Sequence, residues 1–158
     1  MAETQNWSAR LAELGITLPS VVPPVAAYVP AVRTGNYVYT SGQLPIVEGK
    51  LTIAGKLGAG VSDDDAKAAA RACALNALAA VDALVGIDSV VRIVKVVGFV
   101  ASAEGFTGQP GVVNGASEFL GEVFGDAGAH ARSAVGVAEL PLGAPVEVEL
   151  IAEVQPES

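Results

Sequence analysis

The sequence predicts an α+β fold in which one mixed sheet carries two helices on one of its faces. Two helical patterns, at residues 62–85 and 111–124, are separated by a β-branched segment at 90–101. Further strand patterns come before the first helix and after the second, so the order of elements is β-β-(β)-α-β-α-β-β. This order lacks the regular β-α-β repetition of nucleotide-binding folds, and helices collected on one sheet face are the simplest arrangement for it.

The chain of 158 residues is long enough for one domain with a substantial core. We expect this single domain at residues 25–158, preceded by an N-terminal extension at 1–24. Within the extension, Asn6 to Leu14 can form a short helix, and the prolines in Ser20 to Pro24 favour an extended chain.

Short strands are predicted before the first long helix. Tyr28 to Val32 is one candidate, and Pro30 places it at a sheet edge because proline cannot donate to a neighbouring strand. Asn36 to Ser41 is a second candidate and Leu51 to Ala54 is a third. The glycine-rich stretch Gly55 to Gly60 lacks the Gly-Lys-Ser/Thr ending of a phosphate loop, so we interpret it as a flexible connection.

The clearest element is the helix predicted from Ser62 to Val85. Ser62 is a good N-cap, Asp63 to Asp65 suit the positive end of the helix dipole, and Gly86 supplies a stop. The many alanines indicate close packing against a sheet. Apolar residues recur at helical spacing, at positions 66, 70, 73, 74, 77, 78, 81, 84 and 85.

The second long helix is predicted from about Gly111 to Phe124 and ends at Gly125. Its buried stripe is expected to contain Val112, Ala116, Phe119, Leu120 and Val123. The strand between the two helices, Val90 to Ala101, is apolar on both faces, as a central strand should be. Two helices can cover only one sheet face, so we expect the other face to be covered by association with further copies of the chain.

Two strands are predicted near the C-terminus, one opening with Arg132 and the other, residues 146–154, carrying Glu147. The connector at 139–145 contains the proline and glycine of a turn, so the two strands are expected to pair as a hairpin. Arg132 shares its face of the strand with alanine and glycine only. Small side chains beside an arginine leave room for a ligand, which indicates a pocket on the sheet.

Arg132 and Glu147 form the first candidate site. The planar guanidinium fork can bind a carboxylate through two parallel hydrogen bonds, and a nearby glutamate can hold or deprotonate a water. A salt bridge, across the hairpin or across a subunit interface, is an equally good structural interpretation. The register decides between them: the two side chains share a face only if Glu147 opposes Ala134 or Gly136, and not Val135.

Composition and charge argue against several function classes. The net charge is -8 and the basic residues are scattered, so no nucleic-acid surface is expected. A single Cys73 and a single His130 cannot supply a structural zinc cluster; we interpret Cys73 as a small core residue and His130 as structural or exposed. No signal peptide is recognised, and the longest apolar run, Val90 to Ala101, is interrupted and too short to span a bilayer. A cytoplasmic protein without membrane contact is therefore expected.

Several stretches resemble one protein family. They are Thr40-Ser-Gly-Gln-Leu-Pro45, the strand Val90 to Ala101, Arg132-Ser-Ala-Val-Gly-Val-Ala-Glu-Leu-Pro141 and Val146-Glu-Val-Glu149. In this order they are similar to the Rid family, also known as YjgF or under the older label endoribonuclease L-PSP. The similarity runs from about Tyr28 to Val154, and the combination of motifs is fairly specific.

The resemblance implies a chorismate-mutase-like α+β fold and a homotrimer whose sheets face inward, with ligand sites between neighbouring subunits. It also implies a reaction. Family members that keep the arginine hydrolyse reactive enamines and imines, such as 2-aminoacrylate and 2-iminopropanoate, to 2-keto acids and ammonia. They use no cofactor and no metal, so the expected partner is a small carboxylate substrate.

Site residues follow from the resemblance position by position. It implies that Arg132 binds the substrate carboxylate and that Glu147 positions the attacking water. It further implies that three polar residues line the cleft: Tyr28, Ser41 and Asn114. Ala134 is also expected beside the substrate; family deaminases often have a cysteine there, so the alanine can change the shape of the pocket.

Two other functions stay open. One is a non-catalytic protein that holds a 2-keto acid on Arg132 as a binder or sensor. The other is ribonuclease activity, which the older family label suggests. The acidic composition and the absence of a cluster of histidine and lysine weigh against the ribonuclease.

Overall fold

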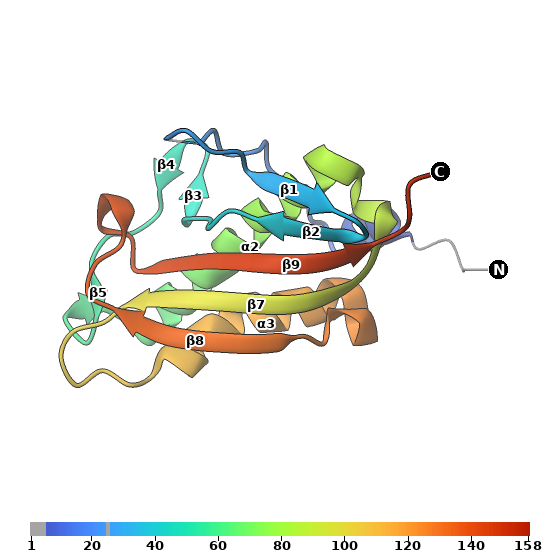
Figure 1. Ribbon diagram of the computed structural model, residues 1–158. Coiled ribbons are helices and arrows are strands. Elements are labelled where there is room, and N and C mark those ends of the chain that lie inside the picture. Colours follow the sequence, from blue (N-terminus) through green and yellow to red (C-terminus); the bar gives the residue numbers. More distant parts are fainter. Residues whose placement is uncertain (1–5, 25) are drawn as a thin grey trace.

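The computed structural model describes residues 6–24 and 26–158. Residues 1–5 of the predicted N-terminal extension, and its predicted boundary at residue 25, lie outside the described residues. The main element is a five-stranded sheet with α2 (Asp63–Val85) and α3 (Gln109–Phe124) behind one of its faces (Figure 1). The predicted α+β class, with one mixed sheet and two helices on one face, is confirmed.

In spatial order, the strands of the main sheet are β1 (Ala31–Thr34), β2 (Tyr37–Thr40), β9 (Val146–Val154), β7 (Val90–Ala101) and β8 (Ala131–Val137). All neighbours run antiparallel except β7 and β8, which are parallel and are joined through α3. Two small pairs lie outside this sheet: β3 (Ile46–Val47) with β4 (Lys50–Leu51), and β5 (Lys56–Leu57) with β6 (Gly60–Val61).

The predicted C-terminal hairpin is wrong, because β7 lies between β8 and β9. β8 pairs with β7 in parallel, and β9 pairs with β7 and β2. The connector between β8 and β9 passes the end of the sheet, where the Ala101 N–H donates to Pro145 O at 2.9 Å. A period of two shows which face a residue occupies and leaves the neighbouring strand undetermined. The long β7 is apolar on both faces and takes a partner on each edge.

The first strand starts later than predicted. Tyr28 lies in a bend, and β1 begins only at Ala31 because Pro30 cannot donate into a ladder. β1 does lie at a sheet edge, as Pro30 indicates. The strand predicted from Leu51 to Ala54 is reduced to the second residue of β4, and the glycine-rich loop carries the β5–β6 pair.

Both core helices begin and end close to their predicted bounds. Ser62 caps α2, with its Oγ accepting from the Asp65 N–H at 3.1 Å, and Gly86 follows with a φ of 81°. α3 begins two residues before the predicted start, with Pro110 in its first turn, where a missing N–H leaves no bond unmade. The predicted stripe of α3 is buried, and so is Cys73 of α2, where burial raises the pKa of the thiol.

The two helices are in close contact at Gly115 of α3. A Cβ at this position would overlap the backbone carbonyl of Lys67 in α2, so the contact requires glycine. Within the described residues α2 is also the one helix long and apolar enough to cross a membrane, and 56% of that apolar stretch is buried inside the fold. Packing against the sheet and α3 accounts for its apolar character.

The N-terminal helix α1 (Trp7–Glu13) is attached to the rest of the fold. Trp7 Nε1 donates to Val90 O at 2.8 Å, at the start of β7, and the Trp7 ring meets Phe124 edge-on with 4.9 Å between centroids. The short helix predicted from Asn6 to Leu14 is therefore confirmed, and it packs where β7 begins and α3 ends.

No helix of residues 6–24 and 26–158 lies over the other face of the sheet (Figure 1). Burial alternates along β9: the side chains under the helices are Val146, Val148, Leu150, Ala152 and Val154. The intervening side chains of β9 face the other way and are half-buried. On that open face Tyr37, Tyr39 and Val135 each remain 44% exposed. This is the face that the sequence predicts to lack a cover within one chain.

Candidate functional site

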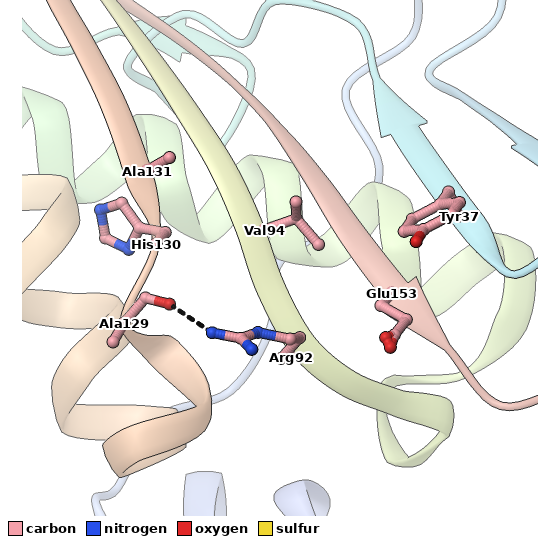
Figure 2. Close-up of a pocket in the computed structure, with 7 residues that line it drawn as sticks. All are labelled: Tyr37, Arg92, Val94, Ala129, His130, Ala131 and Glu153. Carbon is pink, nitrogen blue, oxygen red and sulfur yellow. Dashed lines mark hydrogen bonds between the residues drawn. The ribbon is translucent and has the colours of Figure 1, made fainter.

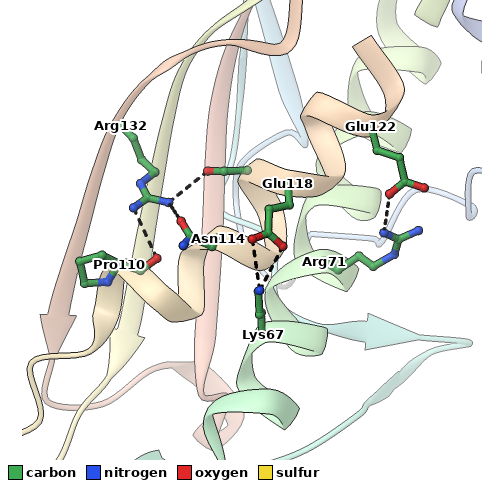
Figure 3. A network of polar contacts seen from close by, with 8 residues as sticks. Lys67, Arg71, Pro110, Asn114, Glu118, Glu122 and Arg132 are labelled. Atoms are coloured by element: carbon green, nitrogen blue, oxygen red, sulfur yellow. Dashed lines mark hydrogen bonds and ion pairs between the residues drawn. The ribbon is translucent and has the colours of Figure 1, made fainter. Parts of the chain in front are cut away.

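Arg132 of β8 lies at the edge of the sheet, and its side chain reaches α3 (Figure 3). Its Nη1 donates to Asn114 Oδ1 at 2.7 Å and to Ser117 Oγ at 3.2 Å, and its Nη2 donates to Pro110 O at 3.4 Å. These acceptors recur at helical spacing, so they line one side of α3. One side of the helix therefore holds the guanidinium, and Asn114 is in direct contact with it.

The Arg132 guanidinium keeps part of its hydrogen-bonding capacity. Its contacts with α3 use both Nη1 hydrogens and one on Nη2, which leaves the Nε–H and the second Nη2–H. Within residues 6–24 and 26–158 the basic side chains that form ion pairs are others: Arg10, Arg33, Lys56, Lys67 and Arg71. The charge of Arg132 is thus held by neutral groups, and its Nε–Nη2 edge suits a carboxylate.

Ser117 connects Arg132 to the single histidine. His130 Nε2 lies 2.9 Å from Ser117 Oγ, and His130 Nδ1 lies 2.6 Å from Gly128 O. From the sequence, Ser117 is not singled out and His130 is interpreted as structural or exposed. The signal that could have found Ser117 is its helical spacing from Asn114, on the side of α3 away from the apolar stripe.

Glu147 lies on the opposite face of the sheet from Arg132. It pairs with Phe99 of β7, and Phe99 pairs with Val135 of β8. Glu147 is thus in line with Val135, and this register separates it from the Arg132 face. No basic side chain of the described chain forms an ion pair with Glu147. The salt bridge considered across a hairpin is therefore wrong.

The Glu147 carboxyl is half-buried against Gly42. A Cβ at Gly42 would overlap this carboxyl, so the glycine makes room for it. Burial and, to a smaller extent, the charge of Glu149 raise the pKa of Glu147. A carboxylate with a raised pKa accepts a proton more readily than an exposed glutamate does, so Glu147 is suited to activate a water.

Tyr28 and Ser41 lie beside the same glycine. Ser41 Oγ donates to Val29 O at 2.6 Å, which ties the segment around Tyr28 to Ser41. Tyr28 is 46% exposed and, together with Gly42, lines a mainly apolar cavity of about 130 Å³. We call Tyr28, Ser41, Gly42 and Glu147 the acidic half-site.

The opposing group, Asn114, Ser117, His130 and Arg132, is called the basic half-site. Ala134 follows on the same face of β8, where it is partly buried against the core and pairs with Gly98 of β7. The next residue on the Arg132 face of β8 is therefore small, as predicted, while Val96 of β7 pairs with Arg132 itself. The two half-sites and Ala134 together contain the residues expected from the sequence, divided between opposite faces of the sheet.

A larger hollow lies on the uncovered sheet face (Figure 2). It has a volume of about 580 Å³ and is lined by Tyr37, Arg92, Val94, Ala129, His130, Ala131 and Glu153. Two of the lining residues are hydrogen-bonded to each other: Arg92 Nη2 donates to Ala129 O at 3.4 Å. His130 is the one member of either half-site that borders it. We therefore assign the candidate chemistry to the half-sites and regard this hollow as part of the open face.

Residues 8–154 match one protein-family model, described as "YjgF/chorismate_mutase-like, putative endoribonuclease". The chain belongs to the YjgF family. The resemblance recognised in the sequence is thereby confirmed, and so is the chorismate-mutase-like form of the α+β fold. The family description names an endoribonuclease and leaves the reaction of this YjgF-family chain to be argued from its site.

Three relatives show the range of similarity. "Protein TCP17" of Trypanosoma cruzi is 45% identical over 148 residues, or 92% of each chain. The crystal structure of a protein of unknown function from Agrobacterium tumefaciens is 44% identical, with a TM-score of 0.87 over 94% of this chain and 92% of the other. E. coli TdcF, solved with bound serine, is 26% identical, with a TM-score of 0.61 over 87% and 93%.

Proposed function

We propose that this YjgF-family chain hydrolyses reactive 2-imino carboxylates, and the enamines that tautomerise to them, to 2-keto acids and ammonia. 2-Aminoacrylate and 2-iminopropanoate represent the substrate class. The observation that carries the proposal is the Arg132 guanidinium, which neutral acceptors of α3 hold while its Nε–Nη2 edge stays available. A carboxylate bound on that edge would fix the position of the adjacent imine carbon.

The site is proposed to form between neighbouring chains of a homotrimer. Arg132 and Glu147 of one chain lie on opposite faces of the sheet, so one small substrate cannot touch both. The open face exposes large apolar side chains that a neighbour would cover. In a ring of subunits, each contact sets one surface against a different surface of the next copy. The basic half-site of one chain can then face the acidic half-site of another.

The proposed reaction is balanced with water alone. Glu147 accepts a proton from water as the water oxygen attacks the imine carbon, and Glu147 then passes this proton to the nitrogen to give a carbinolamine. Transfer of the hydroxyl proton to the nitrogen then breaks the C–N bond, so ammonia leaves and the keto group forms. An imine carbon is already electrophilic, so orientation and one proton acceptor suffice. The Tyr28 and Ser41 hydroxyls would orient the reacting groups, and Ala134 would border the substrate.

Release of pyruvate and ammonia from freshly generated 2-iminopropanoate tests the proposal. We expect the wild-type chain to release both faster than spontaneous hydrolysis does, and Arg132→Ala to give no acceleration. Equal rates for the wild type and Arg132→Ala would refute the proposal. Turnover should need no added metal or cofactor, which dialysis against a chelator would check.

A 2-keto acid binder without turnover is the second candidate. The available edge of Arg132 favours it, and so does the serine bound to TdcF, since serine also carries a carboxylate. Pyruvate binding without imine turnover would select this function. Ribonuclease activity has less support, because the net charge is -8 and the basic residues are scattered. RNA cleavage that persists in homogeneous protein would revive it.

We place the proposed reaction in the cytoplasm. The single Cys73 is buried and free, which suits a reducing compartment. Fractionation of cells that produce the protein, with an antibody against it, would test this placement.

A further inference from the structure

We infer that Ser117 and His130 are positioning residues that hold the Arg132 guanidinium in the orientation needed to bind a carboxylate. The inference rests on the proposed function, because it takes Arg132 as the carboxylate receptor. It concerns a hydrogen-bonded chain, the relay, that joins Arg132, Ser117, His130 and Gly128 O. Ser117 and His130 would act through the arginine and would not touch the substrate.

With a neutral His130 ring, the chemistry of the partners sets the direction of each hydrogen bond. Gly128 O can only accept, so His130 Nδ1, 2.6 Å away, carries the proton. In the neutral ring His130 Nε2 then accepts, and the Ser117 hydroxyl at 2.9 Å donates to it. Ser117 Oγ is left with its lone pairs for Arg132 Nη1, which donates to it at 3.2 Å. Donation therefore runs from Arg132 to Gly128 O.

Fixing the Ser117 hydroxyl also fixes the guanidinium. A hydroxyl without His130 can rotate, and in some rotamers its hydrogen would point at Arg132 Nη1 instead of accepting from it. Asn114 Oδ1 accepts the other Nη1 hydrogen at 2.7 Å. With the relay intact, both Nη1 hydrogens of Arg132 therefore form hydrogen bonds. The Nε–Nη2 edge is then oriented before the ligand arrives, and less side-chain entropy is lost on binding.

A direct role for His130 as a general base fits the geometry less well. Both of its ring nitrogens already have partners, Gly128 O and Ser117 Oγ. Its Nε2 faces α3 and not the available edge of Arg132. The half-buried ring is thus placed to orient a neighbour and poorly placed to take a proton from a substrate.

Four variants separate the relay from general packing. Ser117→Ala removes the hydroxyl, and Ser117→Thr keeps one. His130→Asn keeps an N–H for Gly128 O but is too short to reach Ser117, whereas His130→Gln offers a carbonyl acceptor near the position of Nε2. Glu118→Ala is the matched control. Glu118 follows Ser117 in α3, but it forms a surface ion pair with Lys67 at 3.0 Å and takes no part in the relay.

Pyruvate affinity and steady-state kinetics give the first readout. We expect Ser117→Ala to raise the pyruvate Kd and the imine KM about tenfold with kcat changed less than about twofold, since an ordering contact to a charged group is lost. His130→Asn should shift both constants about threefold to fivefold. The rescue variants Ser117→Thr and His130→Gln, and the Glu118→Ala control, should stay close to the wild type.

The double variant Ser117→Ala/His130→Asn tests whether His130 acts on Arg132 only through Ser117. If His130 acts only through Ser117, the double variant should bind pyruvate as well as Ser117→Ala alone. Additive losses, or His130→Gln as weak as His130→Asn, would overturn the relay and leave His130 a packing residue.

The ¹⁵N guanidinium signals of Arg132 give a readout that needs no substrate. They can be assigned by their loss in Arg132→Lys. We expect separate Nη1 and Nη2 signals in the wild type, which merge in Ser117→Ala and in His130→Asn as rotation about the Cζ–Nε bond is freed. Signals that remain separate in both variants would contradict the inference. If the wild type neither binds pyruvate nor hydrolyses imines, the proposed function fails, and these signals alone decide the relay.

Discussion

The basic and acidic half-sites are built in different ways. Arg132 is fixed by side-chain contacts to α3 and is complete within one chain. Glu147 is fixed by the alternation of β9 and by the absence of a side chain at Gly42, and it lies on a sheet face without a cover. Under the proposed function, a single chain would suffice to bind a carboxylate, and the reaction of the bound group would need a neighbouring chain.

The two half-sites also differ in electrostatics. The positive charge of Arg132 is surrounded by neutral oxygen atoms, which do not cancel it. The negative charge of Glu147 is opposed by burial and by Glu149, so its pKa is raised. Bringing the two half-sites together across an interface would satisfy both charges, with a carboxylate substrate and a water between them. Substitutions in either half-site therefore should have different kinetic signatures.

Loss of Arg132 should have the largest effect. Arg132→Ala is expected to lower kcat/KM for 2-iminopropanoate by about 1000-fold, because two charge-assisted hydrogen bonds to the carboxylate are lost. Arg132→Lys should recover little, since an ammonium cannot replace the planar fork. Initial rates of pyruvate release at several substrate concentrations measure both.

The control for Arg132 is Lys67→Met, which removes a partly exposed cation of α2. Lys67 pairs with Glu118 on the helix surface, so its loss should leave kcat/KM within about twofold. Wild-type kinetics in Arg132→Lys would show that substrate binding does not need the planar guanidinium, and would contradict the role assigned to the basic half-site.

Glu147→Gln should separate chemistry from binding. We expect kcat to fall about 100-fold, the usual contribution of a positioned proton acceptor, while the pyruvate Kd changes less than about threefold. The base must be ionised, so wild-type activity should decline as the pH falls through a pKa raised above about 4.3, the ordinary value for glutamate. Glu147→Gln should lack this acid limb in a profile of kcat against pH.

Glu149→Gln is the matched variant for that profile. It removes the like charge that helps to raise the pKa of Glu147, so the acid limb should move to lower pH with kcat at neutral pH little changed. A limb that stays in place, or one that survives in Glu147→Gln, would assign the proton acceptor to another group.

Mixing the two inactive variants tests the division between chains. If trimers of Arg132→Ala and Glu147→Gln form at random, roughly three quarters of them contain both kinds of chain. Each mixed trimer has one intact site among its three sites. Roughly a quarter of wild-type activity should therefore return. Co-refolding at equal concentrations, with each variant refolded alone as the control, measures this. If both residues served one site within a chain, the mixture would stay inactive.

The elements that local patterns describe well were predictable from the sequence. α2 carries its own start and stop in Ser62 and Gly86, and β7 is bounded where its apolar run ends. The pairing of β8 was not predictable in this way, since its alternation is the same whichever strand lies beside it. The strand predicted around Tyr28 starts only at Ala31, after the bend that ends at Pro30.

The site was predictable in part. The family resemblance supplied Arg132 and Asn114, and the structure shows them in contact. The relay beside Arg132 was harder to find, because Ser117 contacts Arg132 from α3 and His130 contacts Ser117 from the segment between α3 and β8. That contact depends on how closely the helix lies against the strand, which spacing in the sequence does not specify. The face of Glu147 relative to Arg132 depended on the pairing partner that the alternation leaves open.

The smallest expected effect concerns stability, and it bears on the charge difference between the half-sites. The pKa of Glu147 is higher in the folded state than in the unfolded state. Glu147 therefore adds most to stability below about pH 4.3, where it is protonated in both states. This contribution is lost as the pH rises through the raised pKa. Glu147→Gln should therefore raise Tm by a few degrees at pH 8 and by less at pH 4.

The same substitution in an Arg132→Ala background sharpens the test. If the guanidinium of the neighbouring chain lies near Glu147 in the assembled protein, it offsets part of the cost of the buried charge, so removing that guanidinium should enlarge the Tm gain of Glu147→Gln at pH 8. Differential scanning calorimetry of the four proteins gives this coupling directly. Equal gains in both backgrounds would show that the two half-sites do not meet, whichever chain each belongs to.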